Sequence, residues 1–220
     1  MKPLSLKDIG DISEYALSKR EDQIWRDISH PVQFNKLRGT NTPSEKIEEY
    51  LFAMSRRHGY LCYIAELYNV HNIAEVGTAQ GLQTFSFAEY LRQNNIDGHV
   101  WTCDIIDVKN RKYEQEYGDL VTFCIGDSQD MSKLLLSSEQ KIDLFYIDGA
   151  HDRGDVIRDV YYLKEHQSES PIWIFDDYDT RFGCYDDIAE IINLSEDHRV
   201  YRVSHVSDKP NHQVIIHGKL

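Results

Sequence analysis

The segment YIDGAHDRGDVIRD, residues 146–159, contains the side chains best suited to chemistry. An apolar run ends there in a carboxylate, Asp148, and a histidine, His151, follows three positions later. Such a pair can supply the hydrogen-bonding groups of a turn. It can also be half of a metal site with a base beside it. A second acidic pair, Asp176-Asp177, ends the apolar run PIWIFDD.

These residues predict a defined chemistry if the fold brings them together. Three carboxylates at one place repel one another unless a cation joins them. Carboxylate oxygens are hard ligands, so Asp148, Asp176 and Asp177 would suit Mg²⁺ or Mn²⁺ better than zinc. A bound cation lowers the pKa of a coordinated hydroxyl, and histidine accepts protons near neutral pH, which makes His151 the candidate base. The alternative is that the acids open a loop and His151 lies on the surface.

Alternating strands and helices would position these residues. From residue 71 onward, apolar runs of strand length alternate with segments of helical period, which predicts a doubly wound, Rossmann-like parallel sheet. Strands are expected at 72–77, 99–104, 120–126, 142–149 and 171–177, and helices at 81–93, 128–136 and 156–166. The last two runs, 198–206 and 211–218, have a link too short for a crossover helix, so the seven-stranded sheet should have an antiparallel last strand.

The loop after the first strand, AEVGTAQGLQTFSF, predicts a ligand site. It places Glu75 at the strand end and Gly77 and Gly81 in the turn before a helix. A nicotinamide site would require G-x-G-x-x-G, whereas this loop has G-x-x-x-G preceded by an acid. That carboxylate suits a ligand with a cationic amino acid portion. A plain glycine-rich turn is the alternative.

Two further acids end neighbouring strands. Asp104 ends the second strand, where it can accept hydrogen bonds from both hydroxyls of a ribose. Asp127 follows the third strand in IGDSQDM, and it is either part of the ligand site or the N-cap of the next helix.

The loop EVGTAQG resembles the first motif of class I, S-adenosylmethionine (SAM)-dependent methyltransferases, in the form found in metal-dependent O-methyltransferases. The layout D-x-x-[HK] followed by D-[DN] is similar to catechol-type and macrocin-type enzymes. The resemblance, over roughly residues 71–217, implies that Asp148, Asp176 and Asp177 bind a divalent ion that also holds the acceptor hydroxyl. His151 stands where the catechol enzymes have lysine, which brings the chain closer to the sugar-modifying, macrocin-like branch.

The expected function is SAM-dependent, Mg²⁺- or Mn²⁺-assisted methylation of a hydroxyl on a small molecule or saccharide. The resemblance assigns cofactor binding to Glu75, Gly77, Gly81, Asp104 and Asp127. Tyr178, Arg181 and Phe182, just beyond the acidic pair, would line the acceptor pocket. Two rivals are an NAD-dependent oxidoreductase, which the missing middle glycine disfavours, and a non-catalytic SAM-binding module, which the three acids disfavour.

Composition excludes several classes of protein. The chain has 220 residues and a net charge of −13, and such a surface repels phosphate backbones, so no nucleic-acid partner is expected. The sequence has no apolar run long enough to span a bilayer and no signal-peptide segment. We therefore expect a cytoplasmic protein that does not associate with membranes. Four widely spaced cysteines predict buried thiols.

The first 70 residues differ from the rest, which predicts an N-terminal helical arm or cap at 1–70 and a SAM-binding core at 71–220. Helices are expected at 42–57, where Thr42 and Glu45 would form a capping box, and at 60–69. Residues 1–40, with Trp25 and Phe34, would be a docked arm or a lid, and exposed aromatic residues there would allow a homodimer.

Overall fold

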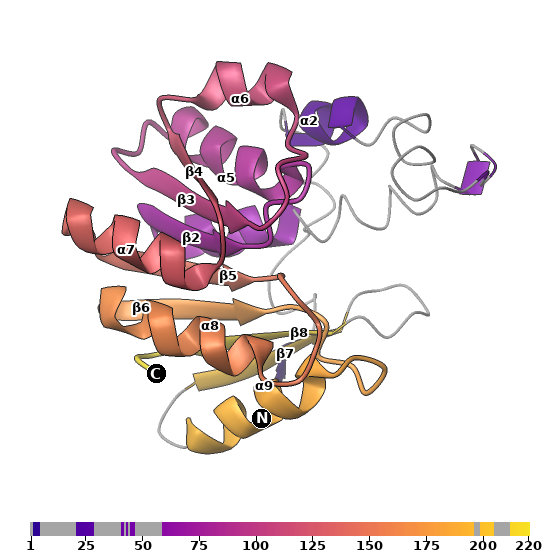
Figure 1. Cartoon of the computed structure of the whole chain (residues 1–220), viewed down its shortest axis with the longest axis vertical. Helices are drawn as coiled ribbons and strands as arrows, with labels where there is room; N and C mark the ends of the chain where they lie inside the picture. Colours follow the sequence, from indigo (N-terminus) through magenta and orange to yellow (C-terminus); the bar gives the residue numbers. More distant parts are fainter. Residues whose placement is uncertain are drawn as a thin grey trace.

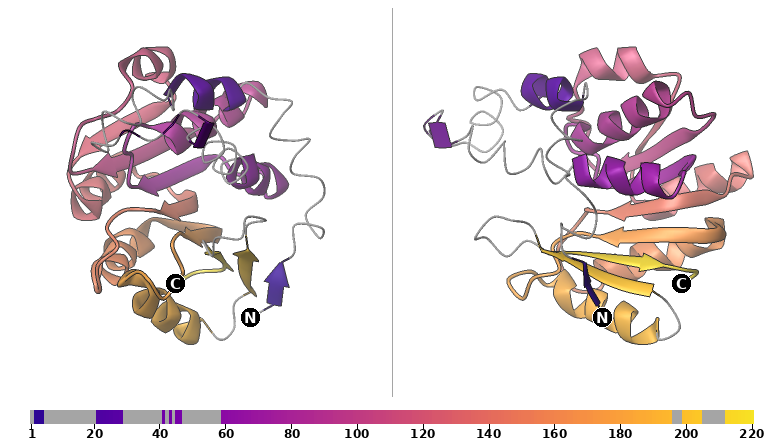
Figure 2. Two further views of the ribbon diagram at one scale, coloured as in Figure 1. Left: turned by 90° about the vertical axis from the view of Figure 1, so that its right-hand side faces the viewer. Right: turned by 180° about the vertical axis from the view of Figure 1, so that it is seen from behind.

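The computed structural model describes residues 2–4, 21–28, 41, 43, 45–46, 59–195, 199–204 and 212–220. These residues form one mixed β-sheet with helices on both faces (Figure 1 and Figure 2). The strands are β1 (Lys2–Leu4), β2 (Asn72–Val76), β3 (His99–Asp104), β4 (Val121–Ile125), β5 (Ile142–Ile147), β6 (Gln167–Phe175), β7 (Arg199–Ser204) and β8 (His212–His217). The fold class predicted from the sequence is confirmed.

The strand order is β1-β7-β8-β6-β5-β2-β3-β4. β8 pairs antiparallel with both β6 and β7, and every other pair is parallel, so the predicted antiparallel last strand is confirmed. The seven expected strands are joined by an eighth, because β1 adds to the edge of β7 in a segment predicted to be a helical arm. Three residues give no periodic signal of their own, so the open edge of β7 determines this strand.

The helices form two layers, each with its own apolar core. They are α2 (Glu21–Ile28), residues 59–67, α5 (Leu82–Gln93), α6 (Arg111–Tyr117), α7 (Ser128–Ser138), α8 (Asp155–Leu163), the 3₁₀ turn η2 (Lys164–His166) and α9 (Cys184–Leu194). α2, 59–67, α5 and α6 bury side chains in one core, whereas α7, α8 and α9 bury theirs in the other. Because both faces are covered, the central strands are apolar almost throughout.

The helix α2 docks on the first layer. Ile24 and Ile28 are buried there, and the Asp27 carboxylate accepts hydrogen bonds from Lys112 Nζ at 2.7 Å and the Tyr113 hydroxyl at 2.8 Å. Of the predicted helix at 42–57, Glu45 and Lys46 are helical.

Some expectations lie outside the described residues. These are Thr42 with its capping box, residues 47–57, Phe34, the Trp25 side chain and the link between the last two strands. Within the described part of the chain, no helix is long and apolar enough to cross a membrane. All four cysteines are free and buried, as predicted.

Candidate functional site

The glycine loop between β2 and α5 lies directly against the chain after β5. Gly77 has φ +99°, and a Cβ there would lie 2.0 Å from the Asp148 carbonyl oxygen, so only glycine fits. Gly81, at φ +85°, caps α5 without a side-chain hydrogen bond. A ligand can therefore approach the backbone N–H groups at this helix N-terminus.

Glu75 lies beneath this loop. Its side chain is buried, and Oε2 accepts hydrogen bonds from the hydroxyls of Thr84 and Thr102, the latter at 2.7 Å. Burial raises the pKa of Glu75 to about 8, and the two threonine hydrogen bonds oppose that shift. The residue is at the strand end, as predicted, and it links the first turn of α5 to β3 from inside the sheet.

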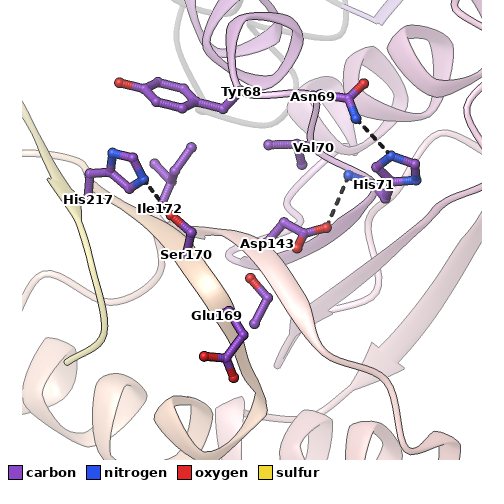
Figure 3. Close-up of a pocket in the computed structure, with 10 residues that line it drawn as sticks. Tyr68, Asn69, Val70, His71, Asp143, Glu169, Ser170, Ile172 and His217 are labelled. Carbon is purple, nitrogen blue, oxygen red and sulfur yellow. Dashed lines mark hydrogen bonds between the residues drawn. The ribbon is translucent and has the colours of Figure 1, made fainter.

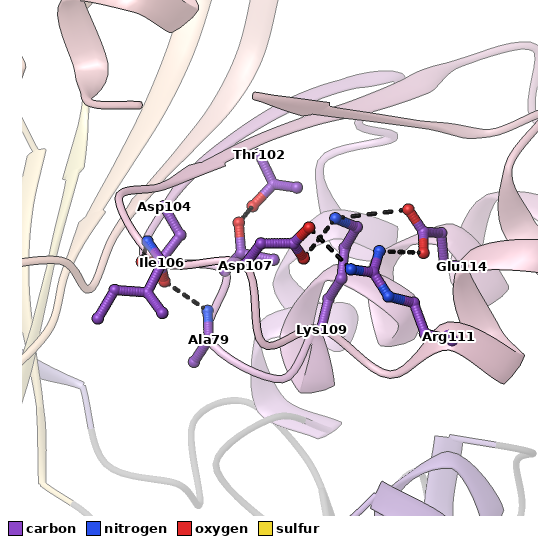
Figure 4. Close-up of polar contacts among 9 residues, drawn as sticks. Ala79, Thr102, Asp104, Ile106, Asp107, Lys109, Arg111 and Glu114 are labelled. Carbon is purple, nitrogen blue, oxygen red and sulfur yellow. Dashed lines mark hydrogen bonds and ion pairs between the residues drawn. The ribbon is translucent and has the colours of Figure 1, made fainter. Parts of the chain in front are cut away.

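Asp104 joins the loops after β2 and β3 (Figure 4). The backbone N–H of Ala79 donates to Oδ2 at 2.7 Å, and that of Ile106 donates to Oδ1 at 2.9 Å. Each oxygen keeps a second lone pair for a ligand. The acid is therefore held in a fixed orientation at the carboxyl edge of the sheet.

A network of charged side chains holds the segment that follows (Figure 4). Lys109 Nζ lies 2.7 Å from Asp107 and 3.4 Å from Glu114, and Arg111 bonds the same two carboxylates at 2.8 and 2.7 Å. Lys109 is buried, although it is charged. The network fixes the loop on which Ile106 lies.

Three exposed apolar side chains lie close to Asp104 in the chain or across the sheet. Ile105, Ile106 and Ile125 are 75%, 59% and 56% exposed, at the ends of β3 and β4. These three residues were not predicted from the sequence, although the segment DII directly after a strand is a signal for Ile105 and Ile106. Exposed isoleucines beside Asp104, the acid predicted to bind a ribose, would suit the flat apolar face of a nucleoside base.

Asp127 is the N-cap of α7. Its Oδ1 accepts hydrogen bonds from the N–H groups of Gln129 at 3.0 Å and Asp130 at 3.2 Å, which confirms the capping alternative. The preceding Gly126 donates its N–H to the Asp104 carbonyl at 3.0 Å. A cofactor contact from the exposed Asp127 remains a prediction.

The acids after β5 and β6 do converge. Asp148, His151 and Asp177 each offer a ligand atom, and these atoms all lie within 4.8 Å of one another. His151 Nδ1 lies 3.3 Å from Asp177 Oδ2. Asp177 is buried and has φ +53°, a left-handed conformation that aspartate tolerates better than most residues.

Asp176 is connected to this group through a tyrosine. Its Oδ1 accepts the N–H of Asp177 at 2.8 Å, and its Oδ2 lies 2.9 Å from the Tyr146 hydroxyl. The same hydroxyl lies 2.8 Å from Asp148 Oδ2. Tyr146 was not among the residues predicted from the sequence. Its signal was the spacing of two from Asp148, which places both side chains on one face of an extended chain.

The loop after Asp177 lies beside His151. The rings of Phe182 and His151 are 5.2 Å apart, and the N–H of Cys184 donates to the His151 carbonyl at 2.9 Å. Tyr178 is buried against Tyr185. Of the residues expected to line an acceptor pocket, Phe182 therefore lies beside the histidine.

A separate pocket of about 340 Å³ lies at the opposite edge of the sheet (Figure 3). It is lined by Tyr68, Asn69, Val70, His71, Asp143, Ser168, Glu169, Ser170, Ile172 and His217. None of the predicted site residues lines it.

The chain is similar to known methyltransferases in sequence and in fold. Residues 74–178, which span the glycine loop and the acidic residues, match the family model described as a methyltransferase domain. The O-methyltransferase TomG from Streptomyces achromogenes, solved with SAM, is 13% identical over 94% of each chain, with a TM-score of 0.67. An O-methyltransferase from Bacillus cereus, solved with S-adenosylhomocysteine (SAH), is 15% identical over 95% of each chain, with a TM-score of 0.67.

An rRNA methylase from Streptococcus thermophilus is 12% identical over 76% of this chain and 96% of that one, with a TM-score of 0.54. A search of curated proteins found no significant match. At such identities the neighbours establish the fold, and the methyl acceptors named for them differ. Residues 74–178 are therefore similar in sequence to a methyltransferase domain, and the chain shares the fold of solved methyltransferases.

Proposed function

We propose that the protein is a SAM-dependent O-methyltransferase that uses a divalent ion, Mg²⁺ or Mn²⁺, to methylate a hydroxyl of a small molecule or saccharide. One observation carries this proposal. The ligand atoms of Asp148, His151 and Asp177 lie within 4.8 Å of one another, and the same turn at Asp148 contacts the glycine loop. A metal site would therefore adjoin the cofactor site.

On the cofactor side, the proposal assigns SAM to the carboxyl edge of β2, β3 and β4. Gly77 and Gly81 would admit the ligand to the backbone, and Glu75 would link the start of α5 to β3 beside them. Asp104 would accept the ribose hydroxyls, and Asp127 would lie on the adenine side. Structures of TomG with SAM and of the Bacillus cereus enzyme with SAH support this choice of ligand.

The donor set fits a divalent ion. The two carboxylates of this group are hard ligands suited to Mg²⁺ or Mn²⁺. Asp148, Asp176 and Asp177 were all expected to be ligands. This proposal keeps Asp148 and Asp177, which belong to the group of converging ligand atoms, and gives Asp176 a supporting role through Tyr146 and its bond to the N–H of Asp177. When bound, the ion would lower the pKa of the acceptor hydroxyl.

His151 is proposed as the base. Because Nδ1 faces the Asp177 carboxylate, a proton on Nδ1 is favoured and Nε2 is left to accept the proton of the acceptor. Methyl transfer would form a bond from the acceptor oxygen to the methyl carbon of SAM and break the bond between that carbon and sulfur, leaving SAH and the methyl ether. Correct alignment of oxygen, carbon and sulfur supplies much of the acceleration.

The rival functions have less support. The family match disfavours a nicotinamide oxidoreductase. The net charge of −13 disfavours RNA as the acceptor, although an rRNA methylase shares the fold. We also propose that residues 1–70 form a cap on the 71–220 core, since α2 and 59–67 bury apolar side chains in the core below α5.

The test is a two-part titration on the purified protein. SAM binding is measured by calorimetry with Mn²⁺ and again after chelation, followed by methyl transfer to a panel of phenols and saccharides. We expect micromolar SAM binding in both conditions and transfer only with metal. Asp148→Ala should abolish transfer and leave SAM binding intact, whereas Asp97→Asn, at an exposed acid away from the site, should change neither. Equal transfer in a chelator would rule out metal assistance.

A further inference from the structure

The hydroxyl of Tyr146 lies between two carboxylates of the candidate site. It is 2.8 Å from Asp148 Oδ2 and 2.9 Å from Asp176 Oδ2, so both contacts have hydrogen-bonding length. Tyr146 is the penultimate residue of β5, and its side chain is fully buried. Since β5 and β6 pair in parallel, with Tyr146 opposite Ile174, the ends of the two strands hold this arrangement in register.

The contact of one hydroxyl with two carboxylates restricts how both acids can be oriented. A tyrosine hydroxyl has a single proton, so it can donate to only one of the two acids at a time. The ring itself cannot shift to favour one acid, because it is packed in the core edge-on to Phe87, with centroids 6.3 Å apart. The hydroxyl therefore lies at a fixed point between one oxygen of Asp148 and one oxygen of Asp176, and it donates to either of them in turn.

We propose that Tyr146 is a positioning residue of the metal site, one that orients the Asp148 carboxylate toward His151 and Asp177 and couples it to Asp176. This inference rests on the proposed function, because it requires that Asp148 binds the ion. Asp176 then acts on the site through two groups, the Tyr146 hydroxyl and the N–H of Asp177. Hydrogen-bonding partners behind a metal ligand commonly affect metal affinity about 10- to 100-fold.

The variant Tyr146→Phe tests this role, because it removes the hydroxyl and keeps the ring. Mn²⁺ alone is titrated into the cofactor-free protein, and free Mn²⁺ is followed by electron paramagnetic resonance. We expect the Kd for Mn²⁺ to rise at least about 10-fold. SAM affinity, measured after chelation, should stay within about two-fold.

Tyr117→Phe is the matched control. Tyr117 is the last residue of α6, away from the site, and it is also fully buried. Its hydroxyl donates a hydrogen bond to a carboxylate oxygen, Glu89 Oε2, at 2.6 Å. A loss of a buried tyrosine–carboxylate bond should lower the melting temperature of both variants. Only Tyr146→Phe should weaken Mn²⁺ binding, which a merely structural role would not do.

Three outcomes separate the hypotheses. Weaker Mn²⁺ binding in Tyr146→Phe alone supports the positioning role. Mn²⁺ binding equal to that of the wild type overturns it and leaves the proposed function standing. Absence of Mn²⁺ binding in the wild-type protein overturns both the metal-assisted function and the role of Tyr146.

Discussion

At the scale of single residues, the site depends on acids held in unusual surroundings. Asp177 has a left-handed backbone, and Glu75 is enclosed within the sheet. Conformations and burials of this kind cost free energy, and in proteins they are found most often at functional sites. Each of the two acids leads to a measurable prediction.

Asp177→Asn should weaken Mn²⁺ binding at least about 10-fold and change the free energy of unfolding by less than about 1 kcal/mol. Asparagine tolerates the left-handed backbone as well as aspartate does, but it has no charge. The measurements are Mn²⁺ titration and urea unfolding. The control is Asn95→Asp, at another left-handed and exposed residue, φ +51°, which should leave Mn²⁺ binding unchanged. An unchanged Kd in Asp177→Asn would remove this residue from the ligand set.

Glu75 should make the stability of the cofactor-free protein depend on pH. Its pKa is raised from 4.5 to about 8 on folding, so the folded state binds the extra proton. Its contribution to stability is therefore complete below about pH 4.5 and is lost as the pH rises through about 8, by up to about 1.4 kcal/mol per pH unit.

Glu75→Gln, which is neutral at every pH, isolates this effect. The free energy of unfolding, measured at intervals from pH 5 to 9, should fall more steeply in the wild-type protein than in the variant. A constant difference between the two proteins across that range would show that the pKa of Glu75 is not raised.

At the scale of elements, the loop between β2 and α5 fits its surroundings through one glycine. Gly77→Ala combines a left-handed backbone with a Cβ that would lie 2.0 Å from a backbone oxygen. We therefore expect the free energy of unfolding to fall by about 2–4 kcal/mol and SAM binding to become undetectable. Gly154→Ala is the matched control, since it has φ +91° and nothing within 4 Å of its Cβ.

Gly154→Ala should lower the free energy of unfolding only by the backbone strain, about 1–2 kcal/mol, and it should retain SAM binding. Thermal unfolding and SAM calorimetry check both variants. Equal losses in the two variants would mean that close packing against Asp148 is unimportant.

The N-cap of α7 distinguishes two roles of Asp127. Asp127→Ser keeps a capping oxygen, so stability should change by less than about 0.5 kcal/mol, but the carboxylate is lost. If Asp127 also contacts the cofactor, as proposed, the Kd for SAM measured by calorimetry should rise several-fold. An unchanged Kd would leave Asp127 with the capping role alone.

At the scale of the whole molecule, the segment before residue 71 shares a core with the sheet. Ile24 is fully buried with residues from 59–67 and α5, so Ile24→Ala should lower the free energy of unfolding by about 2–4 kcal/mol. Urea should unfold the variant in a single cooperative transition. Leu67→Ala, at a side chain that is 57% exposed, should cost less than about 0.5 kcal/mol. Two separate transitions would show that the N-terminal segment unfolds independently of the core.

Much of the molecule could be predicted from local patterns. Apolar periodicity gave the parallel strands and the antiparallel last strand, because period and turn length are properties of neighbouring residues. The G-x-x-x-G loop and the strand-ending acids Asp104, Asp148 and Asp176 were located in the same way. The roles of these residues toward SAM and metal remain predictions.

The tertiary structure decided what depends on register between strands far apart in the chain. Pairing of β5 with β6 places the Tyr146 hydroxyl between Asp148 and Asp176, and the backbone turn at Asp177 places that carboxylate beside His151. The addition of β1 to the edge of β7 also depends on pairing between segments far apart in the chain. Sequence determined which side chains reach the carboxyl edge of the sheet, and only packing determined which of them touch, because contacts between distant residues have no local signal.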